Sequence, residues 1–127
     1  MLKHTLVMAA LLPTILVGCA VAQTTAPATV AETGKGKTLV DAKGMTLYTF
    51  DKDAAGKSAC NGPCAVNWPP LTANSASGPT DWTVIARDDG SKQWAFAGKP
   101  LYTWAKDGKP GDTTGDGFNN VWHVAHP

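Results

Sequence analysis

The stretch "LYTFDKD", Leu47 to Asp53, returns 54 positions later as "LYTWAKD", Leu101 to Asp107. The spacing beyond it returns as well, because Tyr48 to Trp68 is a separation of 20 and Tyr102 to Trp122 is again 20. A phrase and a distance that recur together, with no gap between them, indicate an internal duplication. We therefore predict two structural repeats, at about residues 38–71 and 92–125.

The repeated phrase has the alternation of a β-strand. Tyr48 and Phe50 should point to one face of such a strand while Leu47 and Thr49 point to the other, since successive side chains alternate. The second copy places Tyr102 and Trp104 in the same way. Each ring can bury about 150 to 250 Å², so we expect the phrase to encode the packing of an interior.

Asp53 and Asp107 come just after the two predicted strands. A short carboxylate in that place can accept backbone N–H bonds and begin a turn, which is the role we predict. A catalytic or metal-binding role for the pair is the alternative.

Composition and charge favour a small all-β domain. The chain has 127 residues, 13 Gly and 9 Pro, and its short β-rich runs alternate with glycine-bearing turns, which is typical of antiparallel hairpins. Only "CAVNW", which begins at Cys64, suggests a short turn of helix. The net charge is +1 and Lys and Arg form no stripe, so nucleic acid is not an expected partner.

The N-terminus has the pattern of an export signal, with Lys3 and His4 before the apolar run Leu6 to Val17. The run ends in "LVGC", which resembles the lipobox of bacterial lipoproteins, where cleavage leaves the cysteine as a lipidated N-terminus. This resemblance predicts lipidation at Cys19, whereas "AVA" before Gln23 fits ordinary signal cleavage. The predicted organisation is a signal peptide at 1–18, a flexible tether at 19–37 and a β domain at 38–127.

Cys60 and Cys64 remain as the only cysteine pair of the mature chain under either cleavage. In an exported protein the intervening Asn61 and Gly62 can supply a tight reversal, so we predict a structural disulfide. A redox-active or metal-binding dithiol is the alternative.

Other candidate sites have less support in the residue pattern. The loop Asp107 to Asn120 is rich in oxygen ligands but fails the spacing of an EF-hand, which leaves only an irregular cation site as an alternative. His123 and His126 are three apart in an expected strand, so in a regular strand they should face opposite sides and not chelate one ion. Fraying near Pro127 would relax this restriction. No arrangement of a nucleophile with its base is evident, and we predict no catalytic residue, no metal and no cofactor.

The repeated aromatic phrase resembles the motif of a known bacterial family. "YTFDKD" and "YTWAKD" both fit Tyr-x-(Phe/Trp/Tyr)-x-x-Asp, and "WPPL" and "GDTTGDGFNNVW" are similar to segments of the bacterial predicted lipoproteins named for that motif, also described as a secreted repeat of unknown function. The resemblance implies a protein of the bacterial envelope and no particular activity.

We therefore expect a lipid-anchored, non-enzymatic envelope protein that binds another envelope protein or a small ligand. Ala20 after the cysteine suggests the periplasmic side of the outer membrane, and cleavage after Ala22 would instead give a soluble periplasmic or secreted protein. One alternative is a periplasmic redox, haem or metal-handling protein that uses the cysteine pair or the two histidines. A small hydrolase built on Asp53 and Asp107 is the other.

Overall fold

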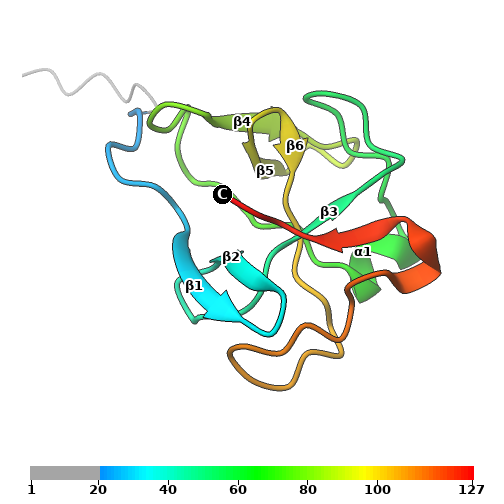
Figure 1. Ribbon diagram of the computed structural model, residues 1–127. Coiled ribbons are helices and arrows are strands. Elements are labelled where there is room, and N and C mark those ends of the chain that lie inside the picture. Colours follow the sequence, from blue (N-terminus) through cyan, green and yellow to red (C-terminus); the bar gives the residue numbers. More distant parts are fainter. Residues whose placement is uncertain (1–20) are drawn as a thin grey trace, which may run out of the picture.

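The computed structural model describes residues 21–127. The predicted signal peptide and Cys19 lie outside these described residues. The strands form three small antiparallel sheets, joined by one short α-helix and one 3-10 turn (Figure 1). The first sheet pairs β1 (Thr29–Thr33) with β2 (Gly36–Val40), the second pairs β3 (Tyr48–Phe50) with β7 (Trp122–Val124), and the third contains β4 (Trp82–Ala86), β5 (Lys92–Phe96) and β6 (Lys99–Pro100). The helix α1 is Pro63–Asn67 and the 3-10 turn is Phe118–Asn120, so the prediction of an all-β fold with one helical turn is confirmed.

The predicted tether is wrong in its second part. Residues 29–37 form β1 and the start of β2, and Ala28 is only 8 % exposed in the hydrophobic core. The segment before β1 is also attached, because the Gln23 N–H donates to the Ser77 carbonyl at 2.7 Å. The strand β1 could not be predicted from its sequence, because it is mostly exposed and carries no aromatic residue. Its position in the fold depends on its pairing with β2.

The two repeats exchange strands with one another. Tyr48 of β3 pairs with Val124 of β7, and the equivalent Tyr102 forms a bridge with Pro70. The aromatic strand of each repeat therefore pairs with the last segment of the other repeat. At the centre, the backbones of Tyr48 and Tyr102 bond to each other in both directions, at 2.8 and 3.0 Å. A pseudo-twofold axis thus passes between these two tyrosines, and the β3–β7 sheet is formed by one strand from each repeat.

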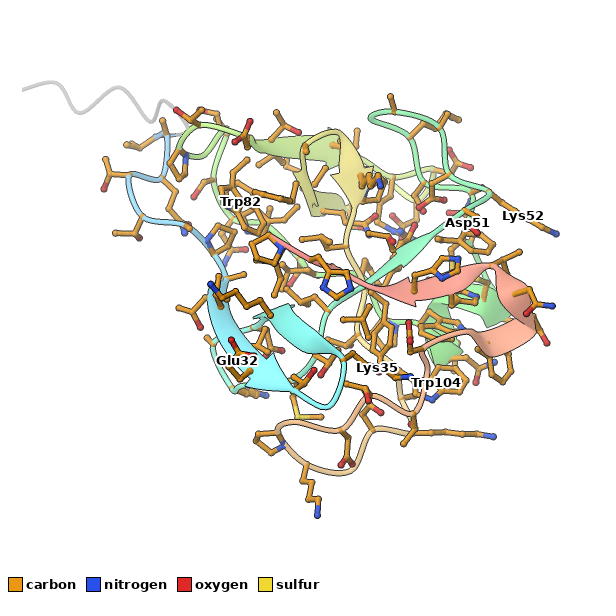
Figure 2. All side chains as sticks on the ribbon, in the orientation of Figure 1. Glu32, Lys35, Asp51, Lys52, Trp82 and Trp104 are labelled. Carbon is orange, nitrogen blue, oxygen red and sulfur yellow. A yellow bond between two sulfur atoms is a disulfide. The ribbon has the colours of Figure 1, made fainter. Side chains whose placement is uncertain are left out.

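The alternation predicted for the repeated phrase separates two hydrophobic clusters. Leu47 and Leu101 belong to one cluster, and Tyr48 and Tyr102 belong to the other; all four have no exposed surface. Figure 2 shows the two sides of this division, with Trp82 and Trp104 on opposite sides of the ribbon formed by β3 and β7. The leucine side also buries the β4–β5 hairpin, and the tyrosine side holds most of the remaining rings. In the part of the chain that the structure describes, no helix has the length and apolar character needed to cross a membrane.

Candidate functional site

Four aromatic rings form a continuous stack on the pseudo-twofold axis. Trp68 and Trp122, which are 54 positions apart, lie face to face with ring centroids 3.8 Å apart. Phe50 stacks on Trp122 at 4.2 Å, and its counterpart Trp104 stacks on Trp68 at 3.9 Å. We call these four rings the aromatic stack, and we use "counterpart" for the residue 54 positions away. The stack explains why both repeats carry the same aromatic letters: each half of the column comes from both repeats.

The two tyrosines pack edge-on against this stack and send their hydroxyls across the repeat boundary. Tyr48 donates to Asp107 Oδ2 at 2.6 Å, and Tyr102 donates to Asp53 Oδ2 at the same distance. Each motif tyrosine therefore bonds to the motif aspartate of the other repeat. This reciprocal pairing was not predicted, because the sequence does not indicate that the two repeats exchange strands.

The two motif aspartates also bond to the turns that follow them. Asp53 Oδ1 accepts the Ala59 N–H at 2.7 Å, and Asp107 Oδ1 accepts the Thr114 N–H at 3.1 Å. These bonds are of the kind predicted for turn-forming aspartates. Burial raises the pKa of Asp53 above its usual value, while the bonds from Ala59 and Tyr102 act in the opposite direction.

Burial also affects the pKa of the two tyrosine hydroxyls. It raises the pKa of both Tyr48 and Tyr102 well above the usual range, and the hydrogen bond to the partner aspartate adds to this effect. Both hydroxyls therefore stay protonated at ordinary pH and act as hydrogen-bond donors. A hydroxyl fixed in this way stabilises the interior.

A buried arginine extends the polar network in one half only. Arg87 is 6 % exposed and its Nη1 donates to Ser58 Oγ at 3.0 Å and to Gln93 Oε1 at 2.8 Å. Ser58 in turn lies 2.6 Å from the Tyr102 hydroxyl, which connects the guanidinium to the carboxylate of Asp53. Arg87 was not predicted from the sequence, because a lone arginine at a strand end is normally a surface residue.

The predicted disulfide is confirmed. Cys60 and Cys64 are joined, with their Cα atoms 5.2 Å apart. Cys60 has no exposed surface and its carbonyl accepts Arg87 Nη2 at 2.5 Å. The bridge therefore closes onto the buried arginine network, and the burial of Cys60 restricts attack by an external thiol.

Two adjoining hollows lie between β3 and the β5–β6 hairpin. Their volumes are about 300 and 530 Å³, and both are lined by Thr49, Asp51, Ala97 and Lys99. We call them together the β3–β6 groove. At one end the groove is bordered by Asp53 and Ala54, and at the other by the C-terminal residues His126 and Pro127.

The groove has an apolar floor and a charged rim. Its floor includes Phe96, Leu101 and Val124. On the rim His123 Nε2 lies 2.7 Å from Asp51 Oδ2, with both side chains about half exposed. This combination suits a ligand with an apolar body and a few polar groups.

The two histidines line one hollow, since the end of the chain departs from the regular strand as the fraying alternative allowed. Strand β7 ends at Val124, so His126 is no longer bound by strand alternation, and it lines the same hollow as His123. His126 Nδ1 lies 2.6 Å from the Lys37 carbonyl oxygen. Among residues 21–127 no group of three His, Cys, Asp or Glu side chains is arranged to hold a metal ion.

The acidic loop between Asp107 and Asn120 uses its carboxylates on the backbone. Asp112 Oδ2 accepts the Gly108 N–H at 2.9 Å, and Asp116 Oδ1 accepts the Val124 N–H at 2.9 Å. The oxygen-rich composition of this loop is thus accounted for by turn formation and by attachment to β7.

These features define a class of protein: a disulfide-bonded, all-β domain made by duplication, with strands exchanged between its repeats. A family model described as a secreted repeat of unknown function matches the chain twice, at residues 29–72 and 83–126. The chain belongs to this family. The two matches are again 54 positions apart, and they begin within β1 and β4, further towards the N-terminus than the repeats predicted from the aromatic phrase. No curated protein and no solved structure matches the chain.

Proposed function

We propose that this protein is a lipid-anchored, non-enzymatic binding module of the bacterial cell envelope, and that it binds its ligand in the β3–β6 groove. The family is described as a secreted repeat, which supports export. The lipobox-like sequence before Cys19 supports a lipid anchor on the periplasmic side of the outer membrane.

One observation carries the binding role: the duplicated fold differs between its halves at the groove. The counterparts of Asp51, Lys99 and His123 are Ala105, Met45 and Pro69. The buried aromatic stack is repeated, yet these three ionisable rim residues occur on one side only. Packing alone would not require this difference, because none of the three rim side chains is buried.

The counterpart region is also filled differently. Pro110 lies against Gly44, where an added Cβ would stand 3.2 Å from the proline ring, and Thr46 Oγ1 donates to the Asp112 carbonyl at 2.6 Å. At the groove the corresponding glycine, Gly98, would have its nearest contact at 3.9 Å, with Ala55. The loop that contains Pro110 therefore packs more closely against Gly44 than the loop that contains Ala55 packs against Gly98.

The volume and lining favour a small molecule or a short segment of a protein partner. Ligand sites commonly enclose about 300 to 1,000 Å³ and combine apolar walls with a few polar groups. The groove falls in this range and offers the charges of Lys99 and Asp51 beside the partly exposed Phe96. No nucleic-acid partner is proposed.

The non-enzymatic part of the proposal is supported by the state of the motif residues. Tyr48 and Tyr102 are buried donors, and Asp53 and Asp107 each accept one tyrosine hydroxyl and at least one backbone N–H. A hydrolase that used the two aspartates would need at least one of them free to meet substrate.

Anchoring is tested by substituting Cys19→Ser in the full-length gene. The wild-type protein should partition into detergent and show an intact mass with acyl chains on the N-terminal cysteine, whereas the variant should stay in the aqueous phase. A wild-type mass that begins at Gln23 would contradict the anchor.

Binding is tested with a photo-crosslinking amino acid in living cells. Ala55 lines the groove, and its exposed counterpart Lys109 provides a matched control on the other repeat. We expect a discrete crosslinked product from position 55 that disappears when Asp51→Ala and Lys99→Ala are combined. Equal products at both positions, or a product at 55 that persists in the double variant, would reject the groove as the binding site.

A further inference from the structure

The segment that leads into β1 lies on the domain surface, held by a specific loop. The Gln23 N–H donates to the Ser77 carbonyl at 2.7 Å, and the Ala76 N–H donates to the Val21 carbonyl at 3.4 Å. Ser75 Oγ adds a bond to Gln23 Oε1 at 3.1 Å. The chain is therefore attached to the domain from its first described residue.

That loop, which we call the anchor loop (Thr72–Thr80), is itself fixed to the core. An added Cβ on Gly78 would stand 2.8 Å from the Trp94 ring and 2.9 Å from Trp82 Cβ. Such a close approach is possible only for glycine, and it presses the loop onto the leucine-side cluster. In Figure 1 the first residues of the described chain, in blue, run beside the start of β4.

The covalent distance to the proposed lipid is short. Only Ala20 separates Cys19 from Val21. Two extended residues span at most about 7 Å, so an acylated Cys19 would hold Val21 within that distance of the membrane anchor. Val21 is 76 % exposed, which leaves its apolar side chain free to contact lipid.

The two segments themselves contain no charged residue, although Asp41 and Lys43 lie beside them. Neither Val21–Ala28 nor the anchor loop contains Asp, Glu, Lys, Arg or His. Their exposed side chains include Ser, Thr and Asn, which can donate hydrogen bonds to lipid phosphate and glycerol oxygens. The two segments therefore add no repulsion from anionic headgroups.

We propose that Val21–Ala28 and the anchor loop form a membrane-facing surface that lies against the lipid headgroups and fixes the orientation of the domain. This inference rests on the lipid anchor of the proposed function. Its consequence is that the domain does not move freely on a long tether. The orange loop of residues 107–112 lies at the opposite edge of the molecule from the first described residues (Figure 1), so the proposal places it away from the bilayer.

The test uses the full-length acylated protein purified from membranes and incorporated into vesicles of phosphatidylethanolamine and phosphatidylglycerol. A fluorophore is attached to a cysteine introduced as Asn74→Cys in the anchor loop or, as control, as Lys109→Cys; both positions are exposed. Headgroup spin-labelled lipid serves as quencher. We expect position 74 to lose most of its fluorescence and position 109 to keep it.

A second variant separates orientation from simple proximity. Insertion of about 24 Gly and Ser residues between Ala20 and Val21 would give a tether with an end-to-end distance of about 27 Å, without touching the Gln23–Ser77 bond. Quenching at position 74 should then fall to the level at 109. Equal quenching at 74 and 109 in the acylated protein would overturn the membrane-facing surface while leaving the lipid anchor intact. Quenching at 74 that the insertion leaves unchanged would instead overturn the role of the short connection in fixing the orientation. An intact mass without acyl chains would instead overturn the anchor, and this inference with it.

Discussion

In one half of the domain the hydroxyl of Tyr102 meets Asp53, and in the other half that of Tyr48 meets Asp107, at 2.6 Å in both cases. The surroundings of the two pairs differ. The first pair continues through Ser58 to the buried Arg87 and the disulfide, whereas the second ends at Thr114, whose hydroxyl donates to Asp107 at 2.6 Å. The aromatic stack and the tyrosine–aspartate pairs are common to both halves, whereas the buried arginine network and the disulfide belong to one half only.

The difference follows from the strand exchange. Because each half of the aromatic stack contains rings from both repeats, a change in one repeat alters the packing of both halves. The groove lies on one side of the axis, where Asp51 of the first repeat meets His123 of the second, and its exposed rim residues are free to differ from their counterparts. The comparison therefore predicts which paired substitutions should have equal effects and which should not.

The largest effect is expected from the stacked tryptophans. Trp68→Ala and Trp122→Ala should each lower the free energy of unfolding by about 3 to 5 kcal/mol, since each removes a buried ring from the middle of the stack. Pseudo-symmetry predicts similar losses for the two variants, measured by denaturant titration. A loss confined to one variant would contradict the equivalence of the two tryptophans in the aromatic stack.

The tyrosine hydroxyls come next. Tyr48→Phe and Tyr102→Phe each remove a hydrogen bond to a carboxylate, which is worth about 1.5 to 3 kcal/mol of unfolding free energy. Tyr48→Phe should be the more costly, because Asp107 is only 9 % exposed and water replaces the lost donor less easily than at the half-buried Asp53. Paired unfolding curves at neutral pH measure the difference, and the reverse order would contradict this account.

The disulfide distinguishes the halves directly, since Phe118 is the counterpart of Cys64. Replacing both Cys60 and Cys64 by alanine should lower the free energy of unfolding by about 2 kcal/mol, the value expected for so small a loop in the chain-entropy model. The loss should appear equally when the wild-type protein is unfolded in the presence of a reductant. A double variant as stable as the oxidised protein would show that the bridge does not stabilise this half.

Asp53 gives a dependence on pH. Since burial raises its pKa in the folded state, the folded protein binds a proton more tightly than the unfolded chain does, and the stability that Asp53 contributes falls as pH rises from its usual pKa through the raised one. The difference in unfolding free energy between wild type and Asp53→Asn should therefore be greatest at the acid end and level off above that range. A difference that grows as pH rises would mean that the bonds from Tyr102 and Ala59 outweigh burial.

The sequence predicted the interior well for a physical reason. Tyr48, Phe50, Tyr102 and Trp104 occupy alternating positions in a repeated phrase, and alternation alone places side chains on a common face. The crossed tyrosine–aspartate bonds could not be predicted, because they depend on which repeat each strand pairs with. The sequence does show that Asp51 differs from its counterpart Ala105. It does not show that Asp51 borders a groove, because the apolar floor of the groove forms only in the folded chain.

The N-terminal boundary failed for a different reason. Residues 21–37 carry small and polar side chains, which are typical of a linker, and their order comes from backbone bonds to β2 and to the anchor loop. Amino-acid composition does not predict such backbone bonds. The short connection from Cys19 to the domain could therefore be recognised only in the structure.

The smallest effect concerns the turn at the edge of the groove. In the first repeat only Gly44 has a positive φ at this turn, whereas in the second both Ala97, at 49°, and Gly98 do. A left-handed alanine is strained, so Ala97→Gly should raise the free energy of unfolding by up to about 1 kcal/mol. Gly34→Ala, at a turn position with open space around it, is the opposite exchange without strain and should not lower stability. Thermal unfolding of the two variants measures both, and a destabilising Ala97→Gly would mean that the Ala97 methyl group contributes more packing at the groove than its backbone strain costs.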